Sequence, residues 1–226
     1  RWLIMVRHIC IFEDAYFRDF FPITLTRPVH LMRAGILPQY ERIRRVLRAD
    51  RLTLLCRTQV APLVAEQVLD FPVNIVKRGS GEDVILVNAR VRTFGDLAEK
   101  LEDEQYFRAF EAGGEVAAVG LKGDMLESLP AVATHEDYLR LLAEHGDAIP
   151  RHATSATLYT RAWEFVEDID RAVGADFGLL ASELSVPKGV TIHSGAFVVD
   201  ETEVYLEDGV EVFPGAVIDA SKGPVY

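Results

Sequence analysis

The sequence predicts an α/β domain over residues 1–183, with a mostly parallel Rossmann-like sheet, and the first coils of a left-handed parallel β-helix over residues 184–226. Two patterns lead to this prediction. In the first part, short apolar runs alternate with helical segments, which is typical of a parallel sheet covered by helices on both faces. In the second part, aliphatic residues recur every six positions, which is the period of a parallel β-helix.

Five segments of the first part have the composition of buried strands, because they are apolar, rich in β-branched residues and too short for helices. They are residues 8–12, 52–57, 73–77, 84–88 and 116–120. The spacing of apolar residues predicts helices at 36–49, 60–69, 93–102, 136–144 and about 162–173, the last ended by Gly174. Ligands of open sheets of this kind bind at the carboxyl ends of the strands.

The six-residue period runs, with one slip of two residues, from Val186 to Ile218. Its aliphatic members are Val186, Ile192, Val198, Leu206, Val212 and Ile218, and glycine lies three places after four of them, at Gly189, Gly195, Gly209 and Gly215. We expect the aliphatic side chains to point into a narrow core and the glycines to turn the backbone without a steric penalty from Cβ. A β-sandwich with glycine turns is the alternative, but it would show alternation with period two. Because the pattern stops in mid-course, we expect further coils beyond residue 226.

The composition and charge of the chain argue against some classes of binding partner. The formal net charge of −11 disfavours nucleic acid, which requires a basic footprint. No apolar run is long enough to span a bilayer. Cys10 and Cys56 lie in apolar runs without metal-binding spacing, so we expect buried, reduced thiols in a cytoplasmic protein. The five arginines between Arg42 and Arg51 are interpreted as a solvated helix face.

The most informative segment follows the first strand and reads FFPITLTRPVHLMRAGI, residues 20–36. It resembles the signature of sugar-1-phosphate nucleotidyltransferases, in which Pro-x-Thr-x-x-x-Pro-Lys follows a glycine-rich loop. Pro22, Thr24 and Pro28 keep this spacing. Val29 stands where the lysine is expected, and residues 12–21 contain no glycine.

The chain is similar to a divergent branch of this superfamily, related to the bifunctional N-acetylglucosamine-1-phosphate uridyltransferase/glucosamine-1-phosphate acetyltransferase. That branch carries Pro-x-Thr-x-Thr-Arg-Pro followed by Arg-x-Gly-Ile, which is matched by Pro22, Thr24, Thr26, Arg27, Pro28, Arg33, Gly35 and Ile36. A later tryptophan helix, a closing Asp-Phe and a turn in the hexapeptide repeats are matched by Trp163, Asp176-Phe177 and residues 219–226. The resemblance therefore covers nearly the whole chain and implies a nucleotidyltransferase-like fold.

The resemblance implies that the ligand is a sugar phosphate or a nucleotide sugar. In working enzymes the backbone N–H groups of the glycine loop approach the phosphates, so this chain would need side-chain cations in their place. The candidate binding residues are Thr26, Arg27, Arg33, Asn88 and Arg90. Arg27 and Arg33 could equally fix the turn between strand and helix, and Asn88 could cap the loop that follows it. No catalytic residue can be assigned.

Magnesium is the cofactor that the superfamily implies, held by an aspartate after a central strand. Arg90 occupies that position here, after Asn88 and Ala89, and an arginine cannot ligate a cation. Asp14 and Asp19 are the carboxylates that could rebuild a metal site. The expected result is a nucleotidyltransferase fold in which magnesium-dependent transfer is altered or lost.

Two functions remain open. The first is a transferase, in which the α/β domain binds the sugar ligand and the complete β-helix transfers an acyl group from acetyl-CoA or another acyl-CoA. The second is an α/β domain without activity that senses a ligand or assembles the β-helix. The family implies a homotrimer in either case. His193 is expected to point outward from the β-helix, and His135 is expected at the surface.

Overall fold

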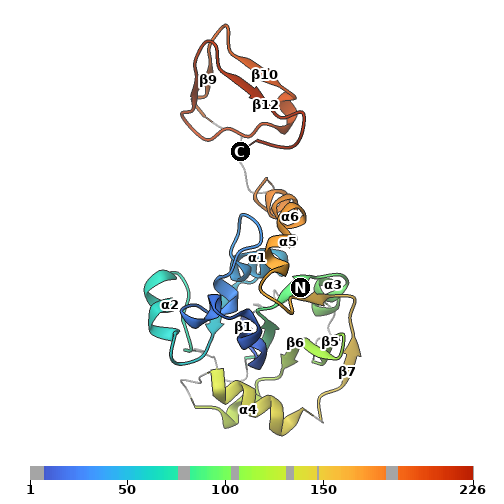
Figure 1. Ribbon diagram of the computed structural model, residues 1–226. Coiled ribbons are helices and arrows are strands. Elements are labelled where there is room, and N and C mark those ends of the chain that lie inside the picture. Colours follow the sequence, from blue (N-terminus) through green and yellow to red (C-terminus); the bar gives the residue numbers. More distant parts are fainter. Residues whose placement is uncertain are drawn as a thin grey trace, which may run out of the picture. The chain divides into compact units, whose positions relative to one another are not determined.

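The computed structural model describes residues 8–75, 82–102, 107–130, 135–146, 148–181 and 188–225. The chain divides into two compact units, residues 1–176 and 177–226. The predicted boundary at 183/184, residues 76–77 of the third predicted strand, and Val186 lie outside the described residues. Figure 1 labels the elements of both units.

A six-stranded mixed sheet forms the centre of the first unit, in the order β2-β1-β3-β6-β5-β7. Its strands are β1 (His8–Phe12), β2 (Arg51–Leu55), β3 (Val84–Asn88), β5 (Ala109–Ala112), β6 (Glu115–Leu121) and β7 (Arg151–Ala153). β1 pairs in parallel with β2 and β3, and β5 with β7, whereas β6 runs antiparallel to both of its neighbours. The predicted α/β class with a mostly parallel sheet is confirmed.

Helices cover both faces of this sheet. The α-helices are α1 (Gln39–Val46), α2 (Ala61–Gln67), α3 (Leu97–Glu102), α4 (His135–His145), α5 (Glu164–Glu167) and α6 (Ile169–Ala181). The short 3-10 helices are η1 (Ala15–Phe20), η2 (Ile23–Leu25), η3 (Val29–Leu31) and η4 (Met125–Ser128), and β4 (Val91–Thr93) pairs with β8 (Thr157–Leu158). In Figure 1, α4 lies on one side of the sheet and α1 and α5 lie on the other.

The alternation of side chains along β1 divides the interior into two cores. Ile9 and Ile11 belong to the core beneath α1, α2, α3 and α5, whereas Cys10 and Phe12 belong to the core beneath α4 and η4. Cys10 and Cys56 are buried thiols that form no disulfide bond, as expected. Burial raises the pKa of the Cys56 thiol to about 12, which keeps it protonated and unreactive.

Three predicted helices differ from the observed ones. The helix predicted at 36–49 is confined to α1, because Pro38 is extended and Arg48 has a positive φ of 50°. The helix predicted at 93–102 begins only at Leu97, since residues 91–93 form β4. The helix predicted at 162–173 is split into α5 and α6, and α6 continues through Gly174, which costs an α-helix only about 1 kcal/mol.

A buried ion pair joins α1 to α6 and corrects the interpretation of α1 as a solvated cationic face. Arg42 is only 4 % exposed. Its Nε and one terminal nitrogen donate to the Asp176 carboxylate at 2.6 and 2.8 Å, and its other terminal nitrogen donates to Gln39 Oε1 at 2.8 Å. Asp176 Oδ2 also accepts the backbone N–H of Leu37 at 2.9 Å. A Cβ at Gly35 would lie 2.5 Å from the same oxygen, so only glycine fits there.

The C-terminal unit contains four short strands that pair in parallel. β9 (Thr191–Ile192) pairs with β11 (Glu211–Val212), and β10 (Phe197–Val199) pairs with β12 (Val217–Asp219), so partners lie about twenty positions apart. η5 (Glu201–Glu203) lies between β10 and β11 in the sequence. The glycines of the six-residue pattern have positive φ angles, from 71° at Gly189 to 91° at Gly195, which confirms that they turn the backbone.

The aliphatic residues of this unit are buried to different degrees. Val212 is buried and Val198 is half-buried, as expected of residues that point into a core. Ile192 is 49 % exposed, contrary to its predicted position in the core, because among the described residues only β11 pairs with its strand. His193 is partly exposed, and its Nε2 lies 2.6 Å from Glu211 Oε1.

Among the described residues, no helix combines the length and the apolar character that crossing a lipid bilayer requires.

We predict that the buried ion pair between Arg42 and Asp176 contributes strongly to the free energy of unfolding. We expect Asp176→Asn to lower the free energy of unfolding by about 3–5 kcal/mol, because it leaves a buried guanidinium without its counter-charge. Asp137→Asn, at an exposed pair with Arg140, should cost less than about 1 kcal/mol. Urea denaturation followed by circular dichroism measures both. The account of this pair is wrong if both substitutions have the same small effect.

Candidate functional site

The carboxyl ends of β1, β2 and β3 meet at one edge of the sheet, where we expect ligands to bind. Glu13 and Asp14 follow β1, Arg57 follows β2, and Asn88 ends β3. These polar residues form two ion-paired clusters, one centred on Arg90 and one centred on Arg57.

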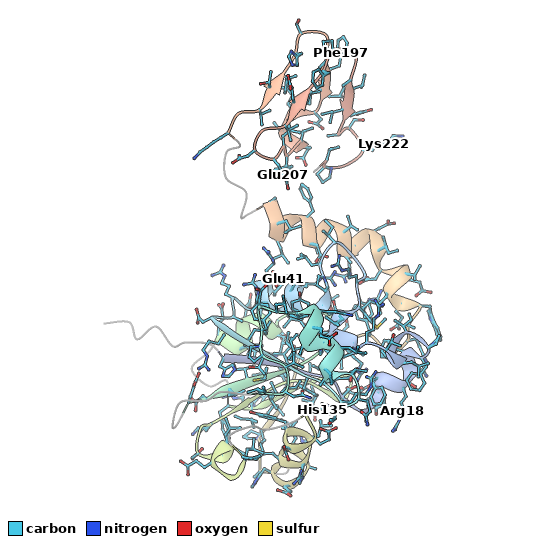
Figure 2. The ribbon with its side chains drawn as sticks, turned by 90° about the vertical axis from the view of Figure 1, so that its left-hand side faces the viewer. Arg18, Glu41, His135, Phe197, Glu207 and Lys222 are labelled. Atoms are coloured by element: carbon cyan, nitrogen blue, oxygen red, sulfur yellow. The ribbon has the colours of Figure 1, made fainter. Side chains whose placement is uncertain are left out.

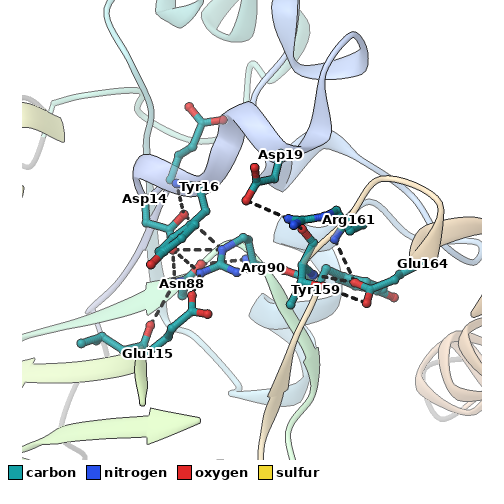
Figure 3. Close-up of polar contacts among 12 residues, drawn as sticks. Asp14, Tyr16, Asp19, Asn88, Arg90, Glu115, Tyr159, Arg161 and Glu164 are labelled. Atoms are coloured by element: carbon teal, nitrogen blue, oxygen red, sulfur yellow. Dashed lines mark hydrogen bonds and ion pairs between the residues drawn. The ribbon is translucent and has the colours of Figure 1, made fainter. Parts of the chain in front are cut away.

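Arg90 lies in the turn between β3 and β4, and its side chain is 2 % exposed. Its Nε and one terminal nitrogen donate to Asp14 Oδ2 at 2.9 and 2.6 Å, and the same terminal nitrogen donates to Glu115 Oε2. The other terminal nitrogen donates to the carbonyl of Tyr159 at 2.9 Å. The guanidinium carbon lies 4.7 Å from the centre of the Tyr16 ring, a cation–π contact. Figure 3 shows these residues around the guanidinium, all three nitrogens of which are engaged by the protein itself.

Asn88 supports the turn that carries Arg90. Its side-chain amide donates to Asp14 Oδ2 at 2.8 Å and to the carbonyl of Val116 at 3.0 Å. Its Oδ1 accepts the backbone N–H of Arg90 at 2.9 Å. Of the two roles left open for this residue, these hydrogen bonds match the cap of the loop that follows it.

The side chains that the structure describes at the carboxyl edge of the sheet do not provide the free oxygen ligands that a magnesium ion requires. A guanidinium has no lone pair to offer a metal, and Arg90 holds the carboxylate of Asp14. Asp19, the second carboxylate considered for a rebuilt site, lies 3.0 Å from a guanidinium nitrogen of Arg161 instead. Within the part of the chain that the structure describes, no group of three or more His, Cys, Asp or Glu side chains is arranged to hold a metal ion.

Arg57 and Glu13 form the second cluster. Both oxygens of the buried Glu13 carboxylate lie within 2.8 Å of one Arg57 nitrogen, and Glu13 also accepts the backbone N–H of Val29 at 3.1 Å. Burial raises the pKa of Glu13, and Arg57 and the Val29 N–H oppose that rise. The other terminal nitrogen of Arg57 donates to the backbone carbonyls of Thr24 and Arg27. This cluster therefore holds the segment that carries the sequence motif.

Two buried histidines lie beside this cluster. His135, predicted at the surface, is buried because its Nε2 contacts the carbonyl oxygen of Glu13; Figure 2 labels it. His30 is fully buried, and neither of its ring nitrogens has a hydrogen-bond partner among the described residues. Burial, reinforced by His135 and Arg57, lowers the pKa of His30 from 6.5 to about 3. Neither histidine was predicted to lie at the carboxyl edge of the sheet, because no nearby residue in the sequence indicates its partner.

The motif residues themselves divide into structural and exposed members. Thr24 is buried, and its hydroxyl donates to the carbonyl of Phe17 at 2.7 Å, so it fixes the turn. Thr26, Arg27 and Arg33 are exposed. Arg33 donates to the carbonyl of Ile36 at 3.3 Å.

Arg27 and Arg33 line one cavity of about 230 Å³. The rest of its lining consists of Leu31, Pro38, Tyr40, Gln67 and Val68. Among the described residues, neither arginine lies within ion-pair distance of a carboxylate, in contrast to Arg57 and Arg90. Of the five predicted site residues, this cavity thus brings together Arg27 and Arg33, whereas Asn88 and Arg90 lie together in the other cluster. Tyr40 and Gln67 were missed, since each lies on a helix without any recognisable motif.

A family model described as sugar nucleotidyl transferase matches residues 9–185, which is more than half of the chain. The chain belongs to the sugar nucleotidyl transferase family. The match covers the segment that carries Arg27 and Arg33 as well as both ion-paired clusters.

Among solved structures, this family member is similar to a putative glucose-1-phosphate thymidylyltransferase from Bacillus anthracis, solved in complex with sucrose. The two share 10 % sequence identity with a TM-score of 0.44, over 80 % of this chain and 97 % of that chain. No match was found among curated proteins.

Because His30 is buried, we predict that the folded protein loses stability in acid. Its pKa of about 3 in the folded protein lies below the ordinary 6.5, so the unfolded chain takes up the proton first. The stability that the neutral His30 contributes is fully present above pH 6.5 and declines as the pH falls toward 3, by about 3 kcal/mol near pH 4.5. We expect His30→Leu to reduce this pH dependence, measured as the free energy of unfolding between pH 7 and 4.5. His152→Leu, at an exposed histidine, is the control, and an unchanged slope in His30→Leu would contradict the assignment.

Proposed function

We propose that the α/β unit of this sugar nucleotidyl transferase family member binds a sugar phosphate or a nucleotide sugar, with a phosphate group held between Arg27 and Arg33. The observation that supports this proposal is the pairing of charges. Arg57 and Arg90 are engaged by carboxylates, whereas the two arginines of the motif line a common cavity without one among the described residues.

The lining of this cavity suits such a ligand. A guanidinium can hold a phosphate through two parallel hydrogen bonds, and two guanidinium groups can share its charge. The hydroxyl of Tyr40 and the amide of Gln67 can form hydrogen bonds with sugar hydroxyl groups. Leu31 and Val68 add an apolar wall for the face of a sugar ring or a base. Thr26, adjacent to Arg27, is proposed as a further hydroxyl contact.

Asn88 and Arg90 have a different place in this proposal. Their hydrogen bonds are directed to Asp14, Glu115 and the backbone, and this favours an indirect role in which they hold the carboxyl edge of the sheet in shape. Ligand binding without magnesium-dependent transfer is therefore the function that we favour for the α/β unit. Transfer of a nucleotidyl group is the second candidate, and membership of the family supports it.

For the C-terminal unit we propose the start of a left-handed β-helix of the hexapeptide type. The parallel pairings about twenty residues apart and the positive φ angles of its glycines support this. β-Helices of this type pack side by side, and we propose a homotrimer for this chain. Exposed apolar residues of the unit, such as Phe197 and Val217, would be covered in such an assembly. Transfer of an acyl group from acetyl-CoA or another acyl-CoA is the activity proposed for the β-helix.

Substitution of the two cavity arginines tests the proposed ligand site. We expect Arg27→Ala and Arg33→Ala each to weaken binding by about 1–3 kcal/mol, because each removes a charge-assisted hydrogen bond to phosphate. Calorimetric titration with uridine and thymidine sugar nucleotides measures the change. Arg18→Ala, an exposed arginine outside the cavity, is the matched control and should leave the affinity unchanged. Unchanged affinity in both cavity variants would show that the ligand binds elsewhere.

Turnover separates the two candidate functions. We expect no magnesium-stimulated release of pyrophosphate from a nucleoside triphosphate and a sugar 1-phosphate, because Arg90 holds the carboxylate that a metal would require. Ion-exchange chromatography that resolves pyrophosphate from the nucleoside triphosphate, with and without EDTA, measures this without a coupling enzyme. Release that needs magnesium would establish nucleotidyl transfer and refute the proposed loss.

A further inference from the structure

Two carboxylates from distant parts of the chain converge on one nitrogen of Arg90. Asp14 follows β1, and Glu115 begins β6, yet both accept a hydrogen bond from the same terminal nitrogen, with Asp14 Oδ2 at 2.6 Å. The carbonyl oxygen of Tyr159 lies 2.9 Å from the other terminal nitrogen. The guanidinium therefore lies among carboxylate and carbonyl oxygen atoms that come from three separate segments (Figure 3).

The guanidinium offsets the repulsion between these two carboxylates. The side chain of Asp14 is 15 % exposed and that of Glu115 is 33 % exposed, so water screens their repulsion only in part. Carboxylate and carbonyl oxygens are also the ligands that hard divalent cations prefer. The same oxygens would suit such an ion if the guanidinium were absent.

We infer that the guanidinium of Arg90 is a built-in cation that takes the place of a divalent metal ion at the carboxyl edge of the sheet, and that its removal uncovers a site for such an ion between Asp14 and Glu115. Unlike a bound metal, this cation cannot dissociate or lose its charge at physiological pH. It carries one positive charge against two carboxylates, so the cluster keeps a net negative charge and repels phosphate. This agrees with a phosphate site at Arg27 and Arg33 but does not depend on it.

Manganese binding tests this inference without any sugar ligand. The full chain is titrated with Mn²⁺, and electron paramagnetic resonance measures the concentration of unbound Mn²⁺ directly. We expect Arg90→Met to bind one Mn²⁺ at least tenfold more tightly than the wild-type chain, and Mn²⁺ to raise its melting temperature. Arg90→Lys retains a positive charge and should not gain the site. The double variant Arg90→Met/Glu115→Gln should lose it again, because it removes one of the two carboxylates.

Equal affinity of Arg90→Met and the wild-type chain for Mn²⁺ would overturn the inference. A second comparison covers the case in which Arg90→Met does not fold. Wild-type protein and Asp14→Asn should have the same affinity for Mn²⁺, since Asp14 is occupied by Arg90. Mn²⁺ binding to the wild type that Asp14→Asn abolishes would show that a metal ion, and not the guanidinium, is the resident cation.

Discussion

The first unit depends on the pairing of each buried arginine with a carboxylate that is buried or half-buried. Arg42 binds Asp176, Arg57 binds Glu13, and Arg90 binds Asp14, and each pair joins segments that are far apart in the sequence. An unpaired charge at any of these places would cost several kcal/mol, so the carboxylates fix where the arginines can lie. The three pairs thereby connect α6 to α1, the motif segment to β2, and the β3–β4 turn to the segment after β1.

This pairing also determines where an anionic ligand can bind. In a superfamily that uses a glycine loop and a metal ion, the carboxyl edge of the sheet receives the phosphates, but here that edge is filled by ion-paired side chains that leave a net negative charge. Glu13 and Arg57 use their hydrogen bonds to hold the motif segment, and Arg90 uses its own to hold two carboxylates. The positive charge that remains for a ligand lies on the outer side of the motif segment, at Arg27 and Arg33.

Local patterns predicted much of the fold and less of the site. The strands at 8–12 and 84–88 and the helix at 136–144 were predicted nearly to the residue, because their side-chain periodicity is itself the cause of the structure. β5 and β7 were missed, since their short sequences carry no run of β-branched residues and they form only by pairing with distant partners. The burial of Arg42 and His135 was missed for the same reason. Their partners, Asp176 and the carbonyl of Glu13, lie more than a hundred positions away.

The central claim is that the phosphate of a ligand binds beside Arg27 and Arg33 and not beside Arg90. Its most direct test is X-ray diffraction from crystals of the full chain soaked in tungstate, a phosphate analogue with a strong anomalous signal, in the presence of EDTA. The account predicts an anomalous peak within hydrogen-bond distance of both Arg27 and Arg33. A peak at the carboxyl ends of β1 and β3, beside Asn88 and Arg90, would contradict it.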